Sequence, residues 1–128
     1  MRRWAALAGI LCLVASPAAA QRIFYPSRLW LDTSAAVQRL SLLGVLEAWR
    51  AQAEREGALP LSHRQREVVR LHECLLAEGH RVDDLVAQLT RFGREAERTF
   101  YSLGDFVSEG LRPLCAGRPG AEPSGPRR

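Results

Sequence analysis

Two cysteines, Cys74 and Cys115, constrain the fold of this chain more than any other feature of its sequence. The third cysteine, Cys12, lies in a leader segment that we expect to be removed, so the remaining two form an even pair. In an exported protein such a pair is most simply a disulfide. Because a disulfide requires its Cα atoms to lie within about 7 Å of each other, the chain must fold back until residue 115 meets residue 74.

The leader has the three parts of a secretory signal peptide. Residues 1–3 are a short basic start, residues 4–14 form an apolar run, and Ala18 and Ala20 supply the small residues that signal peptidase requires. The apolar run is shorter than the ~20 residues of a membrane-spanning helix. We therefore expect cleavage between Ala20 and Gln21, no membrane anchor, and a mature protein that is periplasmic or secreted.

The net charge of +4 does not indicate a nucleic-acid-binding protein. Residues 21–115 contain 13 Arg and 13 Asp plus Glu, so this part of the chain is neutral. The excess positive charge lies near the two ends of the chain, in Arg2, Arg3, Arg118, Arg127 and Arg128. Proteins that neutralise phosphates concentrate their basic residues on one face. We therefore expect no nucleic acid among the partners.

Composition divides the chain into three parts. Residues 1–20 are the predicted signal peptide, and residues 21–115 carry the apolar periodicity of a single helical domain. Residues 116–128 are rich in Pro, Gly and Arg without an apolar pattern, which predicts a disordered tail. Residues 23–31 hold three aromatic residues around Pro26 without helical spacing, so we expect an extended lead that covers the bundle.

The first predicted helix runs from about Ser34 to Glu56 and ends at Gly57. Its apolar residues share a face of roughly 100°, and they are Ala35, Leu42, Val45, Leu46, Trp49 and Ala53. Gly44 inside this helix costs up to ~1 kcal/mol relative to alanine. A close approach by another helix would explain the glycine.

The second predicted helix begins after Ser62, whose spacing to Gln65 is that of a capping box, and ends at Gly79. His72 falls among the apolar residues of this helix. There it is more simply a hydrogen-bonded histidine at the core edge than a ligand.

Periodicity after Asp83 would allow one helix of about 27 residues that ends near Gly110. If that helix were antiparallel to its predecessor, residue 110 would lie about 30 Å beyond the level of Cys74. The five residues from there to Cys115 reach only about 17 Å. The unbroken helix and an intramolecular disulfide therefore exclude each other.

We predict that the helix is broken. One part runs from Asp83 to about Gly93, and the other runs from about Tyr101 or Ser102 to Leu111. The alternatives are an unbroken helix and a disulfide that joins two molecules.

The expected fold class is all-α. It is a compact bundle of four short helices, stapled by one disulfide between Cys74 and Cys115, with the extended lead before it and the disordered tail after it.

No residue pattern in the chain predicts catalysis or a metal site. His63, His72 and His80 are too far apart in sequence for any two of them to share a helical face at ligand spacing. Ser102 and Asp105 lie in no triad motif. We therefore expect a protein that is not an enzyme and that needs no metal and no cofactor.

Two groups of charged residues have simple structural explanations. Asp83 and Asp84 are most simply a helix start, with Asp83 as its cap. The remaining group is interpreted as a solvated helix face, made by Glu47, Arg50, Glu54, Arg55 and Glu56.

Five features occur in a recognisable order. They are Trp30-Leu31, the Gly-x-x-acid segment 44–47, Cys74, the acidic helix start with its leucine and valine residues at 82–89, and the last helix with its cysteine at 106–115. In this order the chain resembles the small periplasmic Tai-type amidase-immunity family of type VI secretion. The resemblance implies a helical inhibitor whose partner is a peptidoglycan amidase. It also agrees with a break before the last helix.

The expected function is therefore that of an exported, non-catalytic binding protein of the bacterial periplasm, an immunity protein against a cell-wall amidase effector. The alternative is a structural or assembly component of the cell envelope with no inhibitory role. In that alternative, exposed aromatic residues such as Trp30 or Trp49 would contact the partner.

Overall fold

The computed structural model describes residues 24–56 and 60–117. The predicted signal peptide with its Ala20–Gln21 cleavage site, the helix end at Gly57 and nearly all of the predicted tail lie outside these residues. The described elements are β1 (Tyr25–Pro26), α1 (Ser27–Asp32), α2 (Ala35–Arg55), α3 (His63–Glu78), α4 (Val82–Glu95), β2 (Thr99–Phe100), α5 (Leu103–Leu111) and the 3₁₀ helix η1 (Arg112–Leu114).

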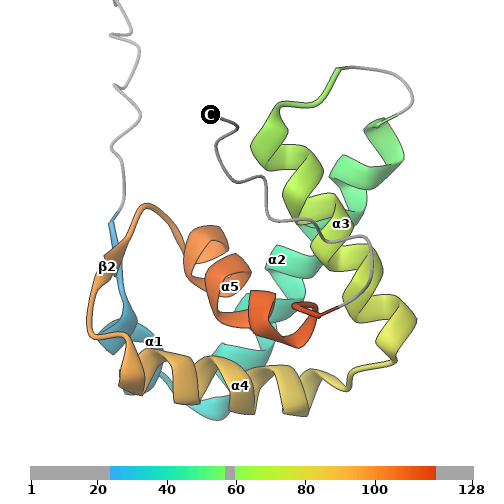
Figure 1. Cartoon of the computed structure of the whole chain (residues 1–128). Coiled ribbons are helices and arrows are strands. Elements are labelled where there is room, and N and C mark those ends of the chain that lie inside the picture. The colour runs from blue at the N-terminus through green and yellow to red at the C-terminus, as the bar shows by residue number, and fades with distance from the viewer. Residues whose placement is uncertain (1–23, 57–59, 118–128) are drawn as a thin grey trace, which may run out of the picture.

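The helices form one bundle around α2, α4 and α5. In Figure 1, α4 runs along one edge of the molecule and α5 packs beside it, while α2 crosses behind both. α3 packs against α2, and the short α1 packs against α4. The all-α prediction is confirmed.

Three predicted helix starts and one predicted end are confirmed. Ser34 accepts a hydrogen bond from the backbone N–H of Val37 at 3.4 Å, and Ser62 forms the capping box with Gln65. Ser102 caps α5, because its side chain accepts a hydrogen bond from the backbone N–H of Asp105. Gly79 ends α3 with a φ of 68°, a left-handed conformation that glycine adopts without steric cost.

The third helix differs from its prediction at both ends. Its N-cap is Arg81, and Asp83 lies in the first turn of α4. There its carboxylate stabilises the helix, because it lies near the positive end of the helix dipole. Gly93 does not end the helix, because the backbone stays helical until Glu95 and leaves the helical region at Ala96. The predicted break exists, but it follows Gly93 by three residues.

The lead is not extended throughout, so residues 24–56 and 60–117 contain five α-helices where four were predicted. Pro26 has a φ of −73° and stands at the N-cap of α1, which suits the fixed ring geometry of proline. Trp30 of α1 is buried at 1% exposure, and its indole Nε1–H donates to Thr90 Oγ1 at 3.2 Å. Burial of this side chain holds α1 against α4.

The predicted disulfide is confirmed between Cys74 and Cys115, whose Cα atoms lie 6.2 Å apart. The chain turns back toward Cys74 in the segment between α4 and α5, which contains the strand β2. This strand pairs antiparallel with β1, in the register Tyr25 to Phe100 and Pro26 to Thr99. An unbroken last helix is therefore excluded.

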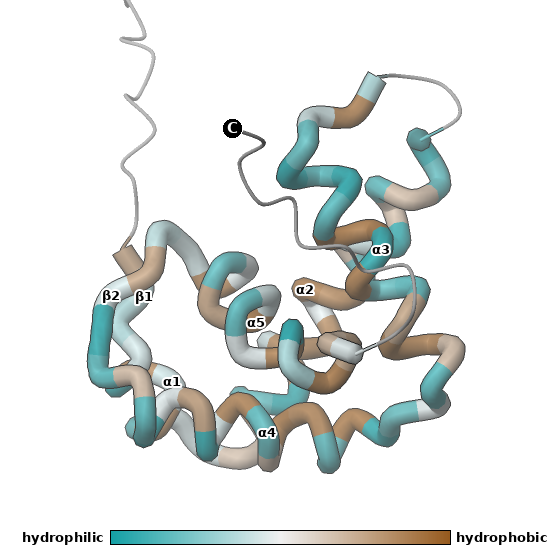
Figure 2. Tube along the Cα trace, viewed as in Figure 1, coloured by the Kyte–Doolittle hydropathy of each residue, from teal (hydrophilic) through white to brown (hydrophobic). Residues whose placement is uncertain are grey.

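The core centres on Phe106 of α5, which has no exposed surface. Its ring lies 5.3 to 5.6 Å, between centroids, from four other aromatic rings, those of Tyr25, Trp30, Phe92 and Phe100. These rings come from β1, α1, α4 and β2, so one side chain joins four elements. Figure 2 shows hydrophobic and hydrophilic residues alternating along α4, as expected of a helix with one buried face.

Gly110 provides a direct test of how tightly α5 packs on α4. A Cβ atom at this position would lie 2.7 Å from Leu89 Cδ2 and 2.7 Å from Phe92 Cδ1, and Leu89 is fully buried. We expect Gly110→Ala to unfold at a lower urea concentration than Gly104→Ala, with a difference of about 1–3 kcal/mol in the free energy of unfolding. Gly104 is the matched control in α5, because its Cβ would meet nothing closer than Ser102 Oγ at 3.6 Å. Equal stability of the two variants would contradict the close packing.

Candidate functional site

The three histidines are not brought together. His72 is buried on α3, as predicted for the core edge, although no hydrogen bond to its ring is observed among the described residues. His63 stands exposed at the start of α3, with Nδ1 3.8 Å from Glu67 Oε1, and His80 follows the end of that helix. Within residues 24–56 and 60–117, no three His, Cys, Asp or Glu side chains form a group that could hold a metal ion.

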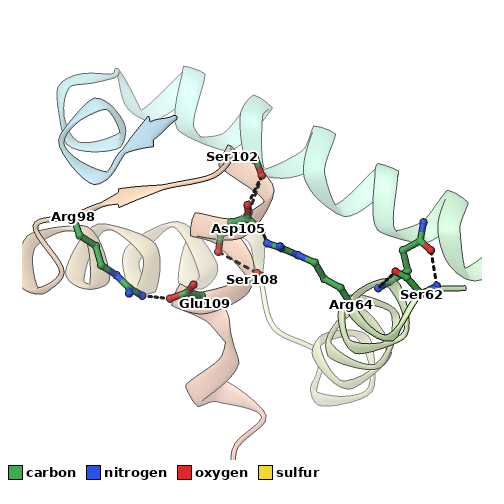
Figure 3. Close-up of polar contacts among 8 residues, drawn as sticks. Ser62, Arg64, Arg98, Ser102, Asp105, Ser108 and Glu109 are labelled. Carbon is green, nitrogen blue, oxygen red and sulfur yellow. Dashed lines mark hydrogen bonds and ion pairs between the residues drawn. The ribbon is translucent and has the colours of Figure 1, made fainter. Parts of the chain in front are cut away.

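Ser102 and Asp105 form a helix cap. The Ser102 hydroxyl donates to Asp105 Oδ2 at 3.0 Å, and the backbone N–H of Asp105 donates back to Ser102 Oγ at 3.2 Å. Arg64 reaches from α3 to the same carboxylate, as Figure 3 shows. The pair therefore fixes the start of α5 and ties it to α3.

The charged residues of α2 lie on a solvated face, as predicted. Arg50 pairs with both Glu47 and Glu54. The hydrogen bond from Arg50 lowers the pKa of Glu47, and the nearby His72 ring contributes a smaller effect in the same direction. Asp83 pairs with Arg39 of α2, so the acidic start of α4 also joins two helices.

Trp30 and Trp49 are not available to a partner. Trp30 is 1% exposed and Trp49 is 4% exposed, so the expectation that they form a contact surface is wrong. Both lie in the core, where a large aromatic side chain buries the most apolar area.

The exposed aromatic surface is formed instead by Phe24 and Tyr101, which we call the aromatic corner. Side chains alternate between the two faces of a strand pair, and Tyr25 and Phe100 point into the core against Phe106. Their neighbours Phe24 and Tyr101 are 59% and 62% exposed, and their ring centroids lie 6.2 Å apart.

The backbone beneath the aromatic corner is held at several points. The N–H of Ser27 donates to the carbonyl of Arg98 at 3.0 Å, and the N–H of Arg98 donates to Ser27 Oγ at 3.3 Å. The Arg98 guanidinium lies 4.7 Å from the centroid of the Phe100 ring and pairs with Glu109 of α5 (Figure 3). A shallow hollow beside the two exposed rings is lined by Phe24, Thr99, Phe100 and Tyr101.

This arrangement suits the binding of an apolar or aromatic group. The two rings offer apolar area on a backbone that is held by hydrogen bonds, and an aromatic side chain has few rotatable bonds to order on contact. The sequence did not predict this surface, because Phe24 falls in the lead that was expected to cover the bundle and Tyr101 falls at a predicted helix start. Phe24 and Tyr25 are adjacent aromatic residues in the sequence, and the pairing of β1 with β2 decides which of them faces outward.

Together these features define a small all-α protein with a disulfide and an exposed aromatic corner. Compared with protein-family models, curated proteins and solved structures, the chain matches none of them. Within the described part of the chain, no helix has both the length and the apolarity required to cross a bilayer. The resemblance to the Tai-type family stays a prediction.

Proposed function

We propose that this chain is an exported, non-catalytic binding protein that acts in the periplasm as an immunity protein against a peptidoglycan amidase. The observation that carries the proposal is the aromatic corner, a pair of exposed rings on a braced backbone. The identity of the partner rests on the resemblance to the Tai-type family.

The energetics of protein interfaces support this use of the aromatic corner. A few aromatic and arginine side chains supply most of the binding energy in such interfaces. Phe24 and Tyr101 are already in contact, and the β1–β2 pairing sets their spacing before any partner arrives. An inhibitor that is organised in advance loses less conformational entropy when it binds its target.

The disulfide supports the proposed compartment. Disulfides form and persist in oxidising spaces such as the bacterial periplasm, and the Cys74–Cys115 pair has bonding geometry. A folded inhibitor in that space would meet an amidase where its peptidoglycan substrate lies.

The proposal is tested by producing the protein together with any peptidoglycan amidase effector that its neighbouring genes encode, both directed to the periplasm. We expect the wild type to prevent lysis and Phe24→Ala/Tyr101→Ala to lose protection, with at least a tenfold weaker affinity for the purified amidase. Leu76→Ala is the matched control, because Leu76 is an exposed apolar residue of α3 that lies apart from the aromatic corner in sequence and fold.

Three outcomes would decide the matter. Unchanged lysis in the presence of the wild type would remove the immunity function. If the double substitution still protects the cells, the immunity function stands and the contact with the amidase lies outside the aromatic corner. Capture of envelope proteins without any hydrolase would favour a role in envelope assembly.

A further inference from the structure

Helix α2 is apolar on two opposite faces. One face carries Leu42 and Trp49 into the core. At 100° per residue the opposite face carries Val37, Leu40 and Leu43, and all three are exposed, Leu40 at 69%. Exposed apolar side chains that lie next to one another often mark a contact surface. We call this exposed surface the outer face of α2.

Gly44 lies on the outer face, and no part of the chain that the structure describes packs closely against it. A Cβ atom at this position would meet nothing within 4 Å, so the close helix approach expected from the sequence does not occur within the described chain. A glycine inside a helix still costs up to ~1 kcal/mol relative to alanine. The exposed backbone at Gly44 is open to a helix from another molecule, and the small side chains of Ala48 and Ala51 extend this flat strip by two turns.

We propose that the outer face of α2 is a self-association surface, on which a second copy of this chain packs its own α2 antiparallel across a twofold axis near Leu43 and Gly44. The contact is noncovalent, because both cysteines outside the leader are joined within one chain. This inference does not depend on the proposed immunity function.

Two charges in the same helical row as Leu43 favour a second copy in this orientation. Arg39 lies one turn before Leu43 and Glu47 lies one turn after it, so an antiparallel partner places Arg39 of each copy opposite Glu47 of the other. A parallel partner would place like charges opposite each other. Both side chains are about half exposed or more, although Arg39 also pairs with Asp83 and Glu47 with Arg50. The cross-copy pairs would therefore extend existing ion-pair networks.

The available area predicts a weak and reversible dimer. The three large apolar side chains of the outer face offer roughly 300 Å² per copy, within the range of functional patches on monomer surfaces. A standard stable interface buries about 800 Å² per partner. We therefore expect a dissociation constant on the order of 10 μM, so dimers form only at elevated protein concentration.

Sedimentation velocity over a concentration series tests the inference, with the protein purified after export and its disulfide formed. We expect the wild type to shift from monomer to dimer as its concentration rises through the micromolar range. Leu40→Glu/Leu43→Glu should remain monomeric, because each copy then carries two carboxylates within the contact, where they repel those of the other copy. Leu76→Glu is the control, since it adds a charge at an exposed leucine of α3 and should dimerise like the wild type.

A charge exchange tests the antiparallel orientation. Arg39→Glu should weaken dimerisation at least tenfold, because it sets two carboxylates opposite each other at both ends of the contact. Adding Glu47→Arg to that variant should restore dimerisation, since every cross-copy pair then has opposite charges again. Circular dichroism of each variant separates loss of association from loss of folding.

Several results would overturn the inference. A wild type that stays monomeric up to about 1 mM would do so, because the expected dissociation constant is about a hundredfold below that concentration. A dimer that survives Leu40→Glu/Leu43→Glu, or a charge exchange without rescue, would place the interface elsewhere. If the protein stays monomeric and its outer face is needed only to bind a different protein, the occupant of that face is not a second copy.

Discussion

Phe106→Ala is expected to lower the free energy of unfolding by about 3–5 kcal/mol, the range for removing a buried phenylalanine ring. Phe106 has no exposed surface and its ring contacts four aromatic rings from four different elements. The cavity left behind cannot close easily, because α1, α4, β1 and β2 would all have to move toward α5. Such a loss is a large part of the 5–15 kcal/mol by which folded domains are stable.

Urea unfolding followed by circular dichroism measures the effect, with Phe24→Ala as the matched control. Phe24 is the same residue type at 59% exposure, so its removal should change the free energy of unfolding by no more than about 0.5 kcal/mol. If Phe106→Ala does not fold at all, Phe106→Leu keeps most of the volume and should lose clearly less stability. Equal unfolding midpoints for Phe106→Ala and Phe24→Ala would contradict the central position of the Phe106 ring.

The helix ends that the sequence predicted correctly depend on neighbouring residues. Ser34, Ser62 and Ser102 each cap a helix by a hydrogen bond to a backbone group three residues away. The left-handed turn at Gly79 is equally local. Signals of this kind can be read from sequence because both partners lie within one turn.

The break in the last helical segment was predicted for a different reason. Local periodicity favoured a continuous helix, and only the distance limit of the disulfide argued against it. The structure places Cys115 beside Cys74 and interrupts the helix between Glu95 and Leu103. The exact residue was missed, because the Gly93 backbone remains helical and packs near Ser27, Leu31 and Phe106.

The features that could not be predicted depend on contacts between distant parts of the chain. The helix α1 is only six residues long and depends on burial of Trp30 beside Thr90. An isolated helix of that length is unstable in water, so its own sequence gives little sign of it. The aromatic corner likewise exists only because residues 25 and 26 pair with residues 100 and 99.

Whether Trp49 is buried or exposed depends on which of the two apolar faces of α2 turns toward the core. Trp49 shares a helical face with Leu42, and that face is buried in α2. The prediction took no account of the opposite face of this helix, where Val37, Leu40 and Leu43 also follow helical spacing. Two apolar faces on one helix leave the inward one undefined until the rest of the bundle is known.

The second large effect is expected from Cys74→Ala/Cys115→Ala, which should lower the free energy of unfolding by about 4 kcal/mol. The disulfide joins residues that are 41 positions apart, and closing a loop of that size removes much of the conformational freedom of the unfolded chain. The folded state also loses the link that holds the chain after α5 against α3. For a domain of this size, a loss of 1 kcal/mol lowers the melting temperature by about 4–8 °C, so the variant should melt well below the wild type.

Reduction provides the control that separates the bond from the side chains. Dithiothreitol should lower the urea midpoint of the wild type to near that of Cys74→Ala/Cys115→Ala, and it should leave the variant itself unchanged. Because the bond acts mainly on the unfolded chain, the far-ultraviolet spectrum of the folded variant at low temperature should stay that of an α-helical protein. A variant as stable as the oxidised wild type would mean that helix packing alone holds residue 115 beside residue 74, and that the disulfide contributes little to the break between α4 and α5.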